Sequence, residues 1–370
     1  MSDGSHNVKV WDAPTRIFHW LLAALVILGI ITGFLSPEWW MGVHIWAGYG
    51  IVVLIVFRLV WGVYGSEYSR IGSFVFPPRR IVEHLRGVLM MRPPHYLGHN
   101  PTGAVMIFAL MIFLVVINVS GLLVLGGEEK QGPLAGIARY PLGNAAKNIH
   151  LFLVITLMTM IVGHVVGVIV ECWITKENLV KSMITGMKSL PDGTPVPEHR
   201  ASRPLPAMIT MVLFTAIAGA ILGFLGQMPP VGHQALPDFP VYNTECGDCH
   251  MAYHPSLLPE KSWKELMSGL DDHFGEAATL DDATVRDITA YLSSYAGDYW
   301  DTEASNRFLK VSPEKPLQIS ESPYWVIKHE KVNDIVFKRR SVKGKGNCIA
   351  CHKDAATGRF DDQKINIPEN

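Results

Sequence analysis

The chain has 370 residues, of which 49% are hydrophobic and only 18% are charged, a composition too apolar for an ordinary soluble protein. Its 32 basic and 33 acidic residues almost cancel, which excludes the strong positive charge typical of nucleic-acid-binding proteins. The apolar residues are concentrated before about Gly226, and the residues beyond it have the composition of a soluble domain. The sequence therefore predicts a membrane region followed by a soluble region.

Five apolar segments of the membrane region are long enough to cross the hydrocarbon core of a bilayer, which is about 30 Å thick. The first follows two basic residues, as a signal peptide would. It contains His19, however, and lacks a small-residue cleavage site, so we expect it to be retained as a helix. The five segments are residues 17–35, 41–64, 104–125, 149–170 and 205–225.

Basic residues are concentrated on one side of these spans. They occur at the N-terminus and in loops 65–103 and 171–204, whereas the other side has only Lys130, Arg139 and Lys147. Because cytoplasmic loops are enriched in Lys and Arg, the N-terminus is predicted to be cytoplasmic. An odd number of spans then places the soluble region outside the cytoplasm.

Four histidines lie within the predicted spans. His150 and His164 are separated by 14 residues of one helix, so they lie on nearly the same face, roughly 21 Å apart. By depth, His164 pairs with His19 on the cytoplasmic side, and His150 pairs with His44 on the opposite side. Ionisable side chains in a membrane are costly and usually functional, and imidazole is an axial ligand of haem iron. Packing histidines are the alternative, but two depth-matched pairs favour two haems.

Other polar residues of the membrane region are less informative. Arg16 and Arg58 lie where haem propionates would emerge, although Arg side chains at these depths also extend to lipid headgroups. His84, His95 and His99 lie in a polar loop, and we expect them to be solvated.

The membrane region contains the motifs VWDAPTRIFHW, HIWAGYG, FRLVWGVYG, GHNPTGA and ENLVKSMITG, in that order. Together they resemble the bacterial cytochrome b561 group, which includes the b-type subunit of nickel–iron hydrogenases, over about residues 8–190. The resemblance implies two haems b held between four helices and electron exchange with membrane quinone. It also implies iron ligands at His19, His44, His150 and His164. The fifth segment has no histidine or charge, and we expect it only to return the chain across the membrane.

The soluble region contains two CxxCH motifs. Two thiols at this spacing bond the vinyl groups of haem c, and the adjacent imidazole ligates the iron. A zinc site made of four cysteines would not explain the histidines, and a redox disulfide normally belongs to a thioredoxin-like βαβ unit that the sequence lacks. The residues are Cys246, Cys249 and His250 in the first motif, and Cys348, Cys351 and His352 in the second.

The sixth ligand of each haem c is less clear from the residues alone. His254 follows the first motif by one helical turn, so it would stay on the proximal side of the haem. His273 can fold back over the first haem, and His329 is the candidate for the second. Since His/Met ligation also occurs in c-type sites, two methionines remain as alternatives. They are Met251 and Met267.

The run CGDCHMAYHPSLLPEKSWKELMSGLDDHFG is followed by ESPYWVIKHEKV and NCIACH. These segments resemble the dihaem cytochromes c called DHC, over about residues 241–370. The resemblance implies two histidine ligands for each haem, His250 with His273 and His329 with His352. It also implies electron delivery to a small periplasmic haem protein, often beside a membrane b-type cytochrome.

Little regular structure is predicted in this soluble region. A helix is expected over residues 281–295, with Thr279 and Asp282 in a capping-box pattern. Much of the rest reads as irregular, so the haems must supply a large part of the core.

The predicted fold is an all-α membrane helix bundle, with a four-helix dihaem b core and a fifth transmembrane helix. A small dihaem cytochrome c domain, mostly α and irregular, follows it. The predicted parts are a b561-type domain (1–190), a cytoplasmic linker with the fifth helix (191–228), a Pro-rich periplasmic linker (229–242) and the dihaem domain (243–370).

The predicted function is that of a tetrahaem electron carrier in the bacterial inner membrane, linking the quinone pool to a periplasmic redox partner. Two histidines on each iron leave no open position, which favours electron transfer over substrate chemistry. No other catalytic residues are expected. The alternatives are a terminal haem oxidoreductase acting on a small molecule, a hydrogenase- or dehydrogenase-linked subunit that reduces quinone, and a haem-based sensor, although no output module is visible.

Overall fold

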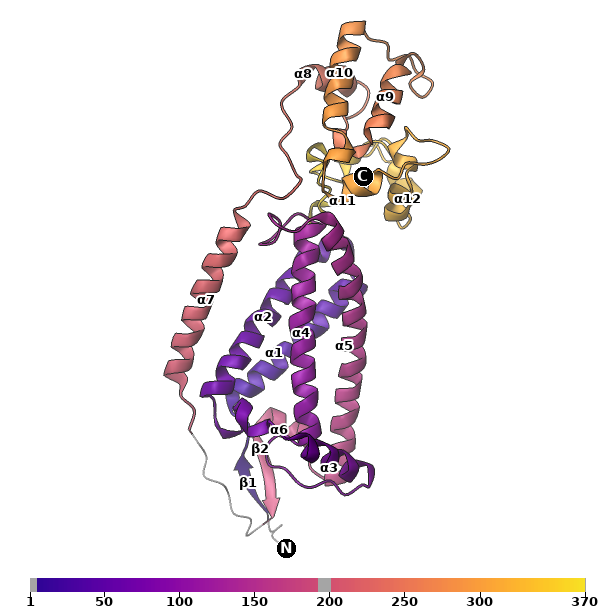
Figure 1. Ribbon diagram of the computed structural model, residues 1–370. Coiled ribbons are helices and arrows are strands. Elements are labelled where there is room, and N and C mark those ends of the chain that lie inside the picture. Colours follow the sequence, from indigo (N-terminus) through magenta and orange to yellow (C-terminus); the bar gives the residue numbers. More distant parts are fainter. Residues whose placement is uncertain (1–4, 192–200, 370) are drawn as a thin grey trace. The chain divides into compact units, whose positions relative to one another are not determined.

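The computed structural model describes residues 5–191 and 201–369 (Figure 1). The chain forms two compact units. The first unit comprises residues 1–36, 43–121 and 147–222, and the second comprises residues 37–42, 122–146 and 223–370. The short segments 37–42 and 122–146, which connect membrane helices, therefore belong with the C-terminal part of the chain.

Five helices of the described residues are long and apolar enough to cross a membrane. Most of their apolar side chains are at least partly exposed, as expected for surfaces that face lipid. They confirm the five predicted spans, and the largest difference is α5, whose 36 residues extend past both predicted ends. The helices are α1 (Ala13–Phe34), α2 (Met41–Tyr64), α4 (Pro101–Gly127), α5 (Tyr140–Thr175) and α7 (Pro204–Gly226).

The helix α1 begins four residues earlier than predicted because it has a well-formed N-terminal cap. The side chain of Asp12 accepts a hydrogen bond from the backbone N–H of Thr15, and a proline occupies the first turn. The preceding strand β1 (Ser5–Lys9) pairs antiparallel with β2 (Met187–Pro191). This pairing joins the two ends of the b561-like sequence in one small sheet.

The predicted loop 65–103 has more structure than expected. It contains the amphipathic helix α3 (Pro78–Leu89), which carries His84. The His84 side chain is fully buried, and its Nδ1 lies 3.0 Å from Thr102 Oγ1. The expectation that His84 is solvated is therefore wrong, whereas His95 is exposed as predicted. A further short helix of this unit, α6 (Leu179–Thr185), follows α5.

The C-terminal part of the second unit consists of short helices around an apolar core. Leu257, Ile288 and Leu292 are almost completely buried there, and α9 packs against α10. Trp263 also lies in this core, where its indole N–H donates to the carbonyl of Pro255 over 2.7 Å. The helices are α8 (Pro240–Gly247), α9 (Glu260–Ser268), α10 (Asp282–Ser294), α11 (Glu303–Phe308), α12 (Pro323–His329) and α13 (Asp334–Phe337).

The N-terminus of α10 differs in detail from the predicted capping box. Asp281, rather than Thr279, is the N-cap residue, and its carboxylate accepts from the backbone N–H groups of Ala283 and Thr284. A carboxylate directly before the helix also interacts favourably with the helix dipole. The helix itself agrees with the predicted range 281–295.

Candidate haem-binding sites

We call His44 on α2 and His150 on α5 the outer histidine pair, after their predicted depth in the membrane. Their ring centroids lie 6.2 Å apart. Two imidazoles on one iron are separated by two metal–nitrogen bonds of about 2 Å and two ring radii of about 1.1 Å, which add to about 6 Å. The outer pair therefore has the spacing of two axial ligands.

Both rings of the outer pair are oriented in the same way. Each Nδ1 lies within hydrogen-bonding distance of a backbone carbonyl of a neighbouring helix. It also lies within hydrogen-bonding distance of a buried hydroxyl group three residues further along that helix. Metal-ligating histidines typically engage their second nitrogen in this manner, which fixes the ring and leaves Nε2 available for the metal. The partners are Gly29 O (3.1 Å) and Thr32 Oγ1 (3.1 Å) for His44, and Ile117 O (3.1 Å) and Ser120 Oγ (3.0 Å) for His150.

Glycine allows the close approach of a helix to each of these rings. A Cβ atom at Gly33 would lie 3.4 Å from Cε1 of His44, and one at Gly121 would lie 3.3 Å from Cε1 of His150. Larger side chains at these positions would press against the imidazoles. The space around both imidazoles of the outer pair is therefore restricted.

The inner histidine pair is formed by His19 on α1 and His164 on α5. The two half-buried imidazoles lie within electrostatic range of each other. Among the described residues, Nδ1 of His19 is buried without a hydrogen-bond partner, and the ring of Trp20 meets the imidazole edge-on at 5.1 Å. This pair therefore lacks the orienting hydrogen bonds of the outer pair on at least one ring.

A buried polar network, which we call the Asp12 cluster, lies at the start of α1. The Asp12 carboxylate accepts hydrogen bonds from two backbone N–H groups and three side chains. Burial alone would raise the pKa of Asp12, but hydrogen bonds from Thr15 and Ser66 outweigh it and lower the pKa. The donors are Thr15 N (2.9 Å), Ser66 N (3.4 Å), Trp61 Nε1 (2.9 Å), Ser66 Oγ (2.7 Å) and Ser69 Oγ (3.0 Å).

Arg58 and His99 extend this network. The buried Arg58 donates to the carbonyl of Ser69 over 2.8 Å, and its guanidinium lies 5.4 Å from the centre of the Phe74 ring. The His99 ring packs against Phe74 at 4.8 Å and Trp11 at 4.6 Å, so the expectation that it is solvated is wrong. Burial and the nearby Arg58 charge lower the pKa of His99 to about 3, which keeps this imidazole neutral.

Arg16 occupies a different position from Arg58. One of its terminal nitrogens donates to the carbonyl of Ile184 on α6. Its Nε is buried and has no hydrogen-bond partner within the described part of the chain. Arg58 is thus a buried cation and Arg16 a half-buried one, both on the side of the inner pair, which suits the anionic propionates of a haem.

The first haem c site comprises Cys246, Cys249, His250 and His273. The rings of His250 and His273 are 6.1 Å apart, again the spacing of two axial ligands. His273 follows the turn after α9, and its backbone N–H donates to the carbonyl of Glu276 over 2.7 Å. The structure therefore brings the predicted sixth ligand opposite the first motif.

His254 lies apart from this pair. Its side chain is buried, its Nδ1 is 2.7 Å from the hydroxyl of Ser256, and its ring packs against Trp300. Burial, together with the nearby imidazole of His233, lowers the pKa of His254 to about 4. These contacts support the prediction that His254 is not an iron ligand.

The second haem c site comprises His329, Cys348, Cys351 and His352. The rings of His329 and His352 are 6.0 Å apart. His329 stacks on Trp325 at 4.2 Å, and its Nδ1 lies 2.8 Å from the carbonyl of that residue. A cavity of about 480 Å³ adjoins His329 and is also lined by Trp325 and Phe337. The ring spacing fits a haem, and the cavity beside His329 has a mostly polar lining.

The chemistry of the cysteines agrees with covalent haem rather than with zinc or a disulfide. All four are free thiols, and burial raises the pKa of Cys246 and of Cys348 to about 11. Such thiols are poor redox nucleophiles. Among the described residues, the cysteines do not gather with one another at metal-binding distance.

Comparisons with known proteins agree with this division. Residues 10–186 match the family model of prokaryotic cytochrome b561, and residues 242–360 match that of dihaem cytochrome c. The C-terminal region belongs to the dihaem cytochrome c family, and the N-terminal region is similar to prokaryotic cytochrome b561. The first match contains all four membrane histidines and the second contains both CxxCH motifs, so this protein is a membrane b-type cytochrome joined to a dihaem cytochrome c. It is a haem protein of electron transport.

The membrane region is similar to proteins named probable Ni/Fe-hydrogenase B-type cytochrome subunit. The protein from Bradyrhizobium diazoefficiens is 26% identical over 220 residues, which cover 51% of this chain and 89% of the relative. A protein from Escherichia coli K12 is 25% identical over 221 residues, which cover 51% of this chain and 93% of the relative. Together with the five apolar helices, these matches indicate an inner-membrane protein.

The C-terminal region is similar to solved dihaem cytochromes c. The protein from Rhodobacter sphaeroides is 39% identical, and the match covers 34% of this chain and 98% of that one, with a TM-score of 0.30. The protein from Shewanella baltica is 31% identical, with coverages of 35% and 92% and a TM-score of 0.28. The relationship rests on sequence identity rather than on these superpositions.

Proposed function

We propose that this protein carries electrons between the membrane quinone pool and a periplasmic redox partner, using four haems held by four histidine pairs. The observation that carries the proposal is a shared spacing. Three of the pairs have ring centroids 6.0, 6.1 and 6.2 Å apart, close to the separation of two imidazoles on one iron. Haem iron held in this way supplies reversible one-electron chemistry.

The residues divide into roles that follow from their chemistry. Eight histidines would hold the irons, four cysteines would attach two of the haems covalently, and two arginines would neutralise propionates. The pairs are His19 with His164, His44 with His150, His250 with His273, and His329 with His352. The cysteines are Cys246, Cys249, Cys348 and Cys351, and the arginines are Arg16 and Arg58.

Complete coordination by two histidines favours electron transfer over reaction with a small molecule. A terminal oxidoreductase needs an iron with an exchangeable position, and each of the four candidate irons has two protein nitrogens assigned to it. We therefore place substrate chemistry at the quinone and at the partner, outside the four iron sites.

We place quinone exchange beside the inner pair. Oxidation of a quinol releases protons as well as electrons, so it requires polar groups next to the electron acceptor. The Asp12 cluster, Arg58 and His99 supply such groups around the inner side of the bundle. The predicted orientation, with a cytoplasmic N-terminus and a periplasmic C-terminal region, places this exchange on the cytoplasmic side.

Hydrogenase-linked electron transfer is the second candidate. The relatives of the membrane region are named as subunits of nickel–iron hydrogenases, and this observation favours a related role in which electrons enter the quinone pool. The same four haem sites would carry electrons in either direction between the partner and the quinone pool. The identity of the partner that co-purifies with the protein distinguishes the two candidates.

Haem quantitation tests the proposal. Acid–acetone extraction of the purified protein should remove two haems per chain and leave two covalently bound. Low-temperature electron paramagnetic resonance should show only low-spin iron. A total of two haems, or no retained haem, contradicts the four-site proposal, and a high-spin signal favours a terminal oxidoreductase instead.

A further inference from the structure

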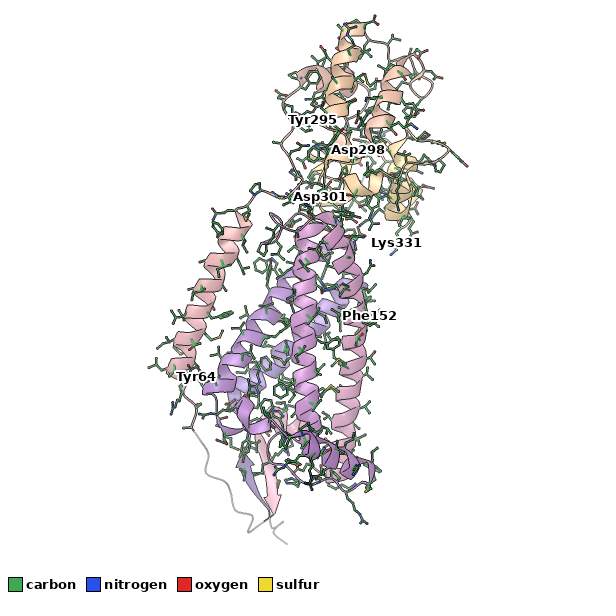
Figure 2. All side chains as sticks on the ribbon, viewed as in Figure 1. Tyr64, Phe152, Tyr295, Asp298, Asp301 and Lys331 are labelled. Carbon is green, nitrogen blue, oxygen red and sulfur yellow. The ribbon has the colours of Figure 1, made fainter. Side chains whose placement is uncertain are left out.

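The dihaem part of the chain forms ion pairs and hydrogen bonds with the segments that connect the membrane helices. The Lys130 ammonium is almost completely buried and lies 2.6 Å from the carboxylate of Asp301, a residue labelled in Figure 2. The same Asp301 oxygen accepts from the backbone N–H of Tyr140 over 2.9 Å, and so caps the N-terminus of α5. Because α5 carries two of the membrane histidines, the dihaem part stabilises the start of that helix directly.

The second haem c site contacts the segment that leads into the outer histidine pair. Lys328, which immediately precedes His329, lies 3.5 Å from the Glu38 carboxylate and 3.8 Å from that of Asp362. Glu38 is in the short turn before α2, six residues before His44. An axial histidine of the second site is therefore adjacent in sequence to a lysine that contacts this turn.

The CxxCH motif of the second site is linked to the same segment through residues 363–366. A Cβ atom at Gly42 would lie 2.8 Å from the side-chain oxygen of Gln363. Two residues later, Ile365 forms a β-bridge with His352, and the next N–H donates to the carbonyl of Cys351 over 2.8 Å. A short series of contacts thus links the start of α2 to the haem-attaching residues of the second site.

A third connection runs through the other outer segment. The Arg359 guanidinium donates to the backbone carbonyls of Glu129 and Lys130. Its neighbour Phe360 packs against the ring of His352 at 5.3 Å. Both outer segments, 37–42 and 122–146, therefore contact the surroundings of the second site.

One side chain connects the two haem c sites. The Tyr253 ring lies 5.0 Å from the ring of His250, and its hydroxyl donates to the carbonyl of Gly346 over 2.8 Å. Gly346 precedes Cys348 by two residues, and a Cβ atom there would lie 2.6 Å from the Tyr253 hydroxyl oxygen. Tyr253 thus contacts His250 of the first CxxCH motif and the residue two positions before the second motif.

Several residues of the first site are exposed. His250 and Cys249 are exposed, and Phe274, directly after His273, has 60% of its side chain accessible. An exposed edge of this kind is what a soluble redox protein requires for docking.

We infer that the two haem c sites have a fixed order, in which the second site exchanges electrons with the membrane and the first, joined through Tyr253, exchanges them with the soluble partner. The inference rests on the proposed function for its direction, but its geometry is independent of it. It assigns Glu38, Lys328 and Gln363 to the membrane-facing junction and Tyr253 to the link between the sites.

Cross-linking tests the junction without any electron transfer. In the full-length holoprotein, Gly42→Cys combined with Gln363→Cys should form a disulfide that mass spectrometry detects as a linked peptide. Gly42→Cys combined with Phe274→Cys, which places the second cysteine at the first site, should not. Linkage of position 42 to position 274 in place of position 363 overturns the order.

Rapid mixing tests the order itself. His329→Met raises the potential of the second haem c, so onward electron transfer becomes unfavourable and quinol-driven reduction of the first haem c should slow about tenfold or more. In His273→Met the second haem c should still be reduced at the wild-type rate. The reverse result, in which only His273→Met slows the other haem, overturns the inference.

Failure of the proposed function has a different signature. If quinol reduces neither haem c of the wild-type protein, the proposed direction is wrong, while the cross-link is unaffected. In that case a soluble reductant presented to the dihaem part should reduce the first haem c before the second. Simultaneous reduction of both haems c contradicts a fixed order.

Discussion

The outer and inner histidine pairs use the same side chains but have different surroundings. In the outer pair, Nδ1 of both His44 and His150 meets a carbonyl and a hydroxyl of a neighbouring helix. In the inner pair, Nδ1 of His19 is buried without a partner among the described residues. The inner side instead has the Asp12 cluster, Arg58 and a buried neutral imidazole, His99.

This difference is consistent with different roles for the two histidine pairs of the membrane region. A site that only passes electrons benefits from rigid ligands, because fixed hydrogen bonds reduce reorganisation when the iron changes charge. A site that exchanges electrons with quinone also needs polar groups that manage protons. Under the proposed function, the outer pair would meet the first description and the inner pair the second.

The largest expected effect comes from removing one ligand of each pair. His164→Leu should eliminate the inner haem and abolish quinol-driven reduction of the haems c, while a soluble dye still reduces them. His150→Leu should eliminate the outer haem, and quinol should then reduce the remaining haem b but not the haems c. Spectra recorded after each reductant measure both results. Undiminished reduction of the haems c by quinol in His164→Leu places quinone on the outer side.

Loss of the Arg58 charge should weaken the inner side selectively. Arg58→Gln removes a buried charged donor from the carbonyl of Ser69, which costs about 1–3 kcal/mol. We expect a lower thermal midpoint and loss of the inner haem before the outer one, followed by haem b absorbance. The exposed Arg79, which pairs only with Glu83 on its own helix, provides the control Arg79→Gln. Equal effects of the two variants contradict a special role for Arg58.

Removing one orienting hydroxyl should have a smaller effect, confined to the outer site. Ser120→Ala deletes a partner of His150 Nδ1, and such changes alter metal affinity by about tenfold at the lower end of the observed range. The outer haem should bind more weakly and have a raised midpoint potential, because a less basic imidazole stabilises ferric iron less well. Thr159→Ala on α5, whose hydroxyl bonds only its own helix, is the matched control. A shift in the inner haem alone is incompatible with this assignment.

Acidification should produce the smallest effect, and it should act on the inner side. The pKa of His99 is about 3 in the folded protein, below its value of 6.5 in an unfolded chain, so the unfolded state binds more protons between these values. Stability is therefore full above about pH 6.5 and falls as the pH decreases toward 3, by at most about 1.4 kcal/mol per pH unit. His99→Gln should flatten the dependence of the thermal midpoint on pH. The exposed His95→Gln should not, and an unchanged slope in His99→Gln rejects the explanation.

The long helices and the metal-binding residue types could be predicted from the sequence because they depend on strong local signals. An apolar run of twenty residues specifies a membrane span, and the CxxCH spacing specifies the attachment of haem c. The depth argument paired His19 with His164 and His44 with His150 from helix direction alone. The 6.2 Å spacing of the outer pair agrees with that argument.

The surroundings of the sites could not be predicted because they depend on contacts between distant segments. Asp12 and Ser69 are 57 residues apart, and Trp11 and His99 meet although nothing in either sequence segment indicates it. The buried hydroxyls of Thr32 and Ser120 did leave a signal, since each is a polar residue in an apolar span. Their role became clear only when the facing imidazoles were located.

Rapid mixing of the wild-type protein with a quinol tests the central claim most directly. With haem b and haem c followed at their separate absorbance bands, haem b should be reduced first, and the haems c should follow with a lag. Reduction of haem b while the haems c remain oxidised, or reduction of the haems c before haem b, would contradict a conduit that begins at the inner pair and ends in the dihaem part.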